Sequence, residues 1–200
     1  MDDYAKAISY ERIKQNKPEK QVVFPLRYYQ KQNFKEFMDL FGGNEVANVS
    51  LFCYFGGLRI FEAAKLKKKD VRVADEGSGV SIRVIGKGAK HRVTYIMEKH
   101  VIAHVKDLLN EIIDSDEYLF AKKFWKKNDC KDLEEESFRA QRVGHYIGTI
   151  IKSKTGYPTH SLRRAFATHL CKMGCEDSTI QTCMGHSKFD TTRRYIEDEV

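Results

Sequence analysis

The sequence has few of the features that mark secreted, membrane-spanning or metal-binding proteins. No apolar run is long enough to cross a bilayer, and the first residues lack the basic stretch followed by an apolar one that marks a secretory signal. The five cysteines are scattered and form no Cys-x-x-Cys pair, so we expect no metal site. There is also no internal repeat and no low-complexity segment. By default, these absences lead us to expect a cytoplasmic protein.

One group of possible metal ligands needs a separate explanation. His169, Cys171, Cys175 and Cys183 lie within a short stretch and could suggest zinc. However, Cys171 and Cys175 are one turn apart on an expected helix, and cysteine is a good small core residue. We therefore interpret this group as part of the hydrophobic core.

The charge of the chain is positive and unevenly distributed. The 200 residues carry a formal net charge of +7, and 42% of them are hydrophobic, which is enough for one substantial domain. The basic clusters are Lys65 to Arg72, Lys87 to Arg92 and Lys122 to Lys127, and the acidic ones are 132–136 and 197–199. Such segregation favours a surface that binds a polyanion such as DNA, although basic runs are also common on solvated faces.

The pattern along the chain predicts an arm followed by one domain. Residues 1–26 are polar, rich in lysine and interrupted by Pro18 and Pro25, so we expect an arm or linker there and a single domain over 27–200. Apolar spacing predicts helices at 27–41, 44–55, 59–65, 101–112, 138–151, 161–173 and 176–184, and a last short helix that bears Tyr195. Period-two alternation predicts strands at 71–73, 80–85 and 92–96. The expected fold class is mostly α with a small three-stranded antiparallel sheet (α+β).

Two arginines and a tyrosine suggest chemistry on a phosphodiester. The charge of a phosphodiester repels nucleophiles, so an enzyme without a metal must offer positive donors to its non-bridging oxygens. Arg59 and Arg163 each provide a permanently charged, planar fork of N–H groups. Tyr195 can attack phosphorus and form a phosphotyrosine. Because a phenol has a pKa near 10, this attack needs a base or a strong positive field.

Other side chains can move the protons of such a reaction. His160 is three residues before Arg163 on an expected helix, so it would share the same face and could accept the tyrosine proton or orient the phosphate. His186 could donate to a non-bridging oxygen. Lys87, in the turn between the last two strands, could protonate the leaving 5′ oxygen.

Glu62 follows Arg59 by one helical turn and could hold its guanidinium in place. Each candidate also has an ordinary explanation: Arg59 could be a surface arginine, Lys87 an exposed hairpin lysine, and Tyr195 an anchor for the last helix. The order in which the residues occur argues against all of these explanations holding at once.

The ordered segments resemble the catalytic domain of the tyrosine recombinase (phage integrase) family, from about Tyr28 to the C-terminus. The resemblance rests on Gly57-Leu58-Arg59 with Glu62, on Val84 to Arg92, on Thr159 to Arg163 continuing through Thr168, and on Met184 to Ser187 with Thr191, Thr192 and Tyr195. The last two segments are the most specific.

The resemblance implies a site-specific DNA recombinase or integrase of a virus, plasmid or other mobile element, acting in the host cytoplasm or nucleoid. It implies that Arg59, Lys87, His160, Arg163 and His186 assist while Tyr195 attacks. The product would be a 3′-phosphotyrosine and a free 5′-hydroxyl, with no metal, cofactor or ATP. The expected partners are double-stranded DNA and, at synapsis, three further copies in a homo-tetramer. We also expect DNA contacts from Lys65, Lys67, Lys90, Arg92 and Arg164.

The sequence departs from the family pattern in several places. Arg164 replaces a histidine that often follows the second arginine, and Lys90 competes with Lys87 for the role of acid. The 26 residues before the domain are too few for the separate helical domain that the family usually carries, so we expect a catalytic fragment or a small recombinase. The short tail after Tyr195 leads us to expect a monomer without DNA. Two alternatives stay open: a type IB topoisomerase and a catalytically silent DNA-binding module.

Overall fold

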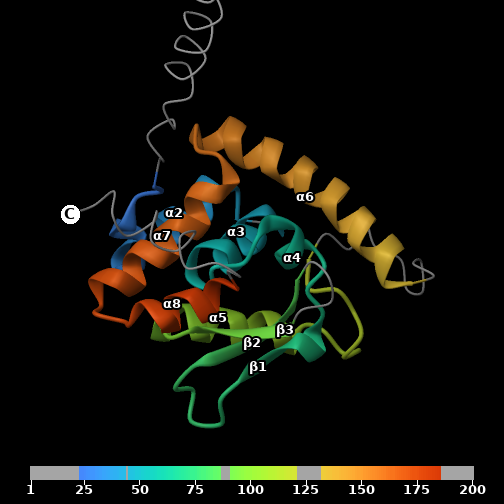
Figure 1. Cartoon of the computed structure of the whole chain (residues 1–200), viewed down its shortest axis with the longest axis horizontal. Helices are drawn as coiled ribbons and strands as arrows, with labels where there is room; N and C mark the ends of the chain where they lie inside the picture. The colour runs from blue at the N-terminus through green and yellow to red at the C-terminus, as the bar shows by residue number, and fades with distance from the viewer. Residues whose placement is uncertain (1–22, 44, 87–90, 121–131, 186–200) are drawn as a thin grey trace, which may run out of the picture.

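The computed structural model describes residues 23–43, 45–86, 91–120 and 132–185 (Figure 1). Its elements are η1 (Leu26–Tyr29), η2 (Lys31–Asn33), α2 (Phe34–Leu40), α3 (Glu45–Phe55), α4 (Ile60–Ala64), η3 (Lys68–Asp70), β1 (Val71–Val73), β2 (Val80–Ile85), β3 (His91–Ile96), α5 (Lys99–Asn110), α6 (Leu133–Thr155), α7 (Thr159–Lys172) and α8 (Asp177–Met184). The predicted class, mostly α with one small three-stranded antiparallel sheet, is confirmed.

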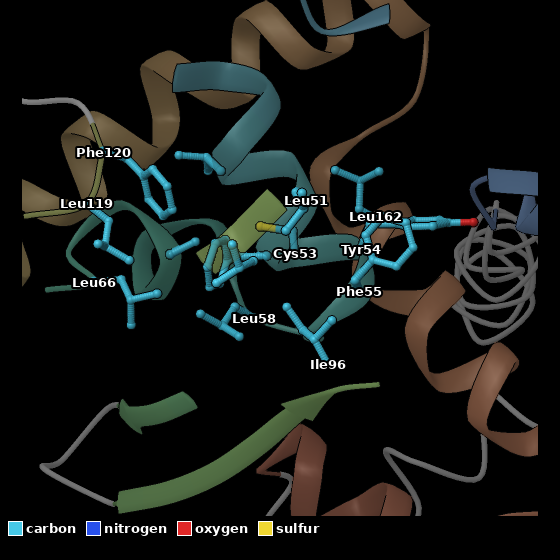
Figure 2. Packing of buried hydrophobic residues seen from close by; sticks show 14 of the residues in the cluster. Leu51, Cys53, Tyr54, Phe55, Leu58, Leu66, Ile96, Leu119, Phe120 and Leu162 are labelled. Atoms are coloured by element: carbon cyan, nitrogen blue, oxygen red, sulfur yellow. The ribbon is translucent and has the colours of Figure 1, made fainter. Parts of the chain in front are cut away.

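Helix α3 forms the centre of the hydrophobic core. It is apolar on nearly all sides, and every residue from Val49 to Phe55 is buried, as expected for a helix enclosed by other elements. Figure 2 shows Tyr54 and Phe55 of α3 close to Leu162 of α7, with Leu58 and Ile96 on the side of the sheet. This central helix gives the neighbouring helices and the sheet a common surface on which to pack.

The packed body begins before residue 27. Phe24 lies within the predicted arm 1–26 but is buried in the core, and its backbone N–H donates to the carbonyl of Ser161 over 3.2 Å. The hydroxyl of Tyr54 donates to the carbonyl of Pro25 over 2.8 Å. Residues 23–26 are therefore attached to α3 and α7, while 1–22 lie outside the described residues.

The sheet has the order β1-β2-β3, and both strand pairs are antiparallel. In β2, buried Val80, Ile82 and Val84 alternate with more exposed residues, so one face of the sheet covers the core. Val84 lies opposite Arg92 of β3. The hydroxyl of Thr94 donates to the carbonyl of Gly56 over 2.9 Å, which ties β3 to the chain just after α3.

Two helices differ from their predicted extents by more than two residues. The predicted helix 27–41 is continuous only from Phe34, because Gln30 adopts an extended conformation between two short 3₁₀ turns. Helix α6 starts five residues before the predicted position 138, because the side chain of Asp132 caps it by accepting from the backbone N–H groups of Glu134 and Glu135 at 2.9 and 2.8 Å. Helix α6 runs past α4 along the edge of the molecule in Figure 1.

No helix within the four described ranges combines the length and the apolar character that a membrane span requires.

Candidate active site

A buried carboxylate, Glu62, lies at the centre of the candidate site. Its side chain, in the first turn of α4, is 0% exposed. It accepts from the backbone N–H of Arg59 over 2.8 Å and from Nη1 of Arg59 over 3.0 Å. The residue before a helix and the third residue inside it lie close together, so this contact follows from local geometry. The contact that the spacing predicts between Arg59 and Glu62 is therefore present.

Arg92 of β3 is the second partner of Glu62. Its Nη1 and Nη2 donate to the two carboxylate oxygens over 2.9 and 2.7 Å, and its Nε donates to the carbonyl of Cys183 over 3.0 Å. The side chain is only 8% exposed. Arg92 is predicted to contact DNA, and in the structure its guanidinium faces a buried carboxylate and the end of α8.

Arg163 of α7 is the third arginine near Glu62. Its side chain is 4% exposed, with Nη1 at 3.9 Å from Oε2 of Glu62. Its guanidinium also donates to the carbonyls of Gly57 and Met184. These bonds connect α7 to the residues before α4 and to the end of α8.

Gly57 brings its carbonyl to Arg163 through a conformation that favours glycine. Its φ is +66°, and a Cβ atom at this position would lie 2.3 Å from Cδ1 of Phe166. A glycine is therefore required both by the backbone angle and by the close approach of α7.

The charges of the site leave a positive excess. Burial raises the pKa of Glu62, but the hydrogen bonds and charge of Arg92, followed by the charge of Arg163, outweigh it and hold this pKa at about 2. Glu62 is therefore ionised at neutral pH. One carboxylate with three guanidinium groups leaves two positive charges in excess, an arrangement suited to binding an anion such as a phosphodiester.

His160, in the first turn of α7, lies within the field of the arginines. Partial burial of its ring lowers its pKa, and the charges of Arg163, Arg164 and Arg59 lower it further. The imidazole is therefore neutral at pH 7 and can accept a proton. The charges of Arg59 and Arg163, which lie in opposite halves of the chain, thus both act on His160.

Four of the predicted residues, Lys87, Lys90, His186 and Tyr195, lie outside the described residues. The residues that border 87–90 and the residues just before 186 are described. Strands β2 and β3, which flank 87–90, remain paired up to Ile85 and His91. Before residue 186, the carbonyl of Met184 accepts from Arg163, and Gly185 is the last described residue.

The remaining basic candidates lie beside α6 or α7. Lys67 pairs with Glu136 at 2.9 Å, and its ammonium lies 4.7 Å from the centre of the Tyr118 ring. Lys65 donates to the hydroxyl of Ser137 over 3.4 Å. These two lysines are therefore engaged by the start of α6. Arg164 is half-buried on α7, and its charge acts on His160.

The role of Arg92 as a partner of Glu62 has no signal in the sequence. The two residues lie on different elements, and no local spacing relates them.

The described cysteines are free thiols, and no group of three or more His, Cys, Asp or Glu residues in the described ranges is arranged to hold a metal ion.

The sequence of the chain is similar to those of one known protein family. The model of the phage integrase family matches residues 30–200. Tyrosine recombinase XerA of Thermococcus kodakarensis is 33% identical over 149 residues, which are 74% of this chain and 49% of that protein. Tyrosine recombinase XerH of Campylobacter jejuni is 28% identical over 179 residues, 84% of this chain and 47% of that protein. The chain spans about half the length of these curated relatives.

Solved structures share the fold. The XerH site-specific recombinase in its post-cleavage complex with the palindromic difH substrate matches with a TM-score of 0.58 and 21% identity, over 88% of this chain and 49% of that one. The catalytic domain of bacteriophage HP1 integrase matches with a TM-score of 0.53 and 17% identity, over 89% of both chains. These relatives give no support to the topoisomerase or silent-module alternatives.

Proposed function

This chain belongs to the phage integrase family, and from that premise we propose that it is the catalytic domain of a site-specific DNA recombinase or integrase. It cleaves and rejoins DNA strands through a covalent 3′-phosphotyrosine. The observation that carries this proposal is the meeting of Arg59 and Arg163 at the carboxylate of Glu62, with His160 three residues before Arg163 on the same helix. The two arginines come from opposite halves of the chain.

The two arginines differ in how they act on the phosphate. Arg59 is 28% exposed and is the more accessible guanidinium, so it donates directly to a non-bridging oxygen. Arg163 is almost fully buried and is held by two backbone carbonyls. Its charge acts from a site of low dielectric, where a preorganised cation stabilises developing negative charge more strongly than in water.

The reaction follows from these positions and from the roles that the family resemblance implies for Lys87, His186 and Tyr195, which lie outside the described residues. Oη of Tyr195 forms a bond to phosphorus while the bond from phosphorus to the 5′ oxygen breaks. His160 takes the phenolic proton, and Lys87 gives a proton to the leaving oxygen. His186 donates to a non-bridging oxygen. The phosphotyrosine conserves the energy of the broken bond, so rejoining by the reverse route needs no ATP, metal or cofactor.

The partners of the chain follow from the same proposal. The XerH structure is a complex with its difH substrate. We expect this chain to bind double-stranded DNA as well, in the host cytoplasm or nucleoid. Four copies meet on DNA at synapsis, and the chain is a monomer without DNA.

Trapping of the covalent intermediate tests the proposal. The 200-residue chain is incubated with a pool of nicked duplexes of random sequence, in which the short strand released on cleavage diffuses away, and adducts are separated on a denaturing gel. We expect a protein–DNA adduct with the wild type and none with Tyr195→Phe, which folds alike but lacks the nucleophilic oxygen. If the wild type forms no adduct, or if Tyr195→Phe forms one, the assignment of the nucleophile is wrong.

A further inference from the structure

Arg92 joins three elements of the site without facing the solvent. It belongs to β3, its two terminal nitrogens hold both oxygens of Glu62 in α4, and its Nε holds the carbonyl of Cys183 in α8. Each of these bonds measures 2.7–3.0 Å, so all three nitrogens of the guanidinium donate within the site. This placement differs from that of a surface arginine waiting for DNA.

We infer that Arg92 is a positioning residue for strand cleavage, acting through Glu62 and the end of α8 rather than by contact with the phosphate. This inference rests on the proposed function, because it concerns the rate of the reaction proposed above. It gives the third arginine a role different from the DNA contact expected from its place in a basic run.

Arg59 and Arg92 share the carboxylate of Glu62. Oε1 accepts from both Arg59 and Arg92, while Oε2 accepts from Arg92 and from the backbone of Arg59. With both oxygens occupied, the guanidinium of Arg163 stays 3.9 Å from Oε2 and bonds to the carbonyls of Gly57 and Met184. Without Arg92, the buried carboxylate would attract Arg163 more closely and move it from these carbonyls.

Arg92 also contacts the end of α8. Gly185 has a φ of +61°, and a Cβ atom on it would lie 2.6 Å from Cδ of Arg92. The backbone of Gly185 therefore packs directly on the Arg92 side chain. Because Arg92 also holds the carbonyl of Cys183, it fixes the chain immediately before His186.

Arg92 also lies near the end of the β2–β3 pairing that borders residues 87–90, which are outside the described residues. It follows position 90 by two positions and lies opposite Val84 in the β2–β3 pair. One side chain thus connects the strand that follows Lys87, the helix that follows Arg59, and the helix that precedes His186. Loss of this connection would displace several groups at once, and a displacement of about 1 Å at reacting groups can lower a rate on the order of 10²-fold.

Arg92→Gln and Arg92→Lys test the inference, with Arg83→Gln as the matched control. Arg83 lies in the neighbouring strand of the same sheet, but it is exposed and pairs with Asp70 at 3.4 Å. The measurements are the single-turnover rate of adduct formation with excess protein, the affinity for the same duplex at several salt concentrations, and the thermal midpoint of each variant.

We expect Arg92→Gln to form the adduct about 10- to 100-fold more slowly, with DNA affinity unchanged within about threefold and the salt dependence unchanged. Arg92→Lys should regain only part of the rate, because one ammonium cannot hold both Glu62 oxygens and the Cys183 carbonyl. Arg83→Gln should cleave like the wild type. A contact to phosphate would instead weaken affinity and reduce the salt slope by about 1, which would overturn the inference.

A double variant tests whether Arg92 acts through Glu62. If it does, Glu62→Gln with Arg92→Gln should be no more than a few-fold slower than the slower single variant, because the two changes break the same unit. A rate loss in the double variant equal to the product of the two single losses would overturn the inference.

If the wild type and Arg83→Gln form the adduct and Arg92→Gln forms it equally fast, the inference alone fails. If the wild type itself forms none, the proposed function fails and the inference falls with it.

Discussion

Two charged clusters of the molecule look similar in the sequence and differ in the structure. The Glu62 cluster, consisting of Arg59, Glu62, Arg92 and Arg163, surrounds a carboxylate that is shielded from solvent. The Glu136 cluster, consisting of Lys65, Lys67, Tyr118 and Glu136 with the adjacent Ser137, lies at the start of α6. The Glu62 cluster contains Arg92 from the basic run 87–92, and the Glu136 cluster contains Lys65 and Lys67 from the basic run 65–72. Only the Glu62 cluster contains predicted catalytic residues.

The chemistry of the two cations explains the difference. The planar fork of arginine can bind a carboxylate through two parallel hydrogen bonds, so several arginines can share one buried acid in a fixed geometry. Lysine is a strongly hydrated point charge on a flexible stem, and Lys67 stays half-buried beside Glu136 and the Tyr118 ring. The Glu62 cluster is therefore suited to fixing reactive groups, while the Glu136 cluster fastens α6 to the preceding chain.

Removal of the central carboxylate of each cluster should give the largest difference between the clusters in the free energy of unfolding. Glu62→Ala leaves buried guanidinium groups without their counter-ion, and we expect a loss of about 3–5 kcal/mol in the free energy of unfolding. Glu136→Ala removes hydrogen bonds from a less enclosed site and should cost about 1–2 kcal/mol. Urea unfolding at pH 7 measures both. Equal losses would mean that burial does not distinguish the clusters.

The backbone that supports the Glu62 cluster should be nearly as sensitive. Gly57→Ala adds a methyl group against Phe166 and also strains a positive φ, so we expect a loss of about 2–4 kcal/mol. Gly77→Ala is the matched control, because its φ is +63° but no atom lies within 4 Å of the added Cβ. It should cost only the strain, about 1–2 kcal/mol. Similar losses measured by urea unfolding would show that the close approach of α7 to Gly57 does not matter.

Acid should weaken the Glu62 cluster in a defined range. The folded pKa of Glu62, about 2, is below its ordinary value of 4.5, so its ion pairs stabilise the fold fully above about pH 4.5 and are lost as the pH falls toward 2. The stability difference between the wild type and Glu62→Gln should therefore shrink by about 1.5 kcal/mol between pH 4.5 and 3. A difference that stays constant over this range would contradict the assigned ionisation.

Much of the fold could be predicted from local pattern. Alternation of apolar residues located all three strands to within one residue, and the helix predicted at 176–184 ends at Met184, just before Gly185 with its positive φ. The misses have local causes that the pattern underweights. An extended Gln30 divides the first predicted helix, and a capping Asp132 lengthens α6, although the sequence alone presents Asp132 as part of an acidic run.

The sequence by itself determined the contact between Arg59 and Glu62 and the shared face of His160 and Arg163, because helical geometry places residues three apart side by side. Only the tertiary structure decided that Arg92 faces Glu62, that Lys67 faces Glu136, and that Arg163 is buried against two backbone carbonyls. Such contacts depend on how the sheet, α6 and α8 pack around α3 and α4. Packing also decides which charges lose their water, and a charged group that loses water must find a partner wherever the fold provides one.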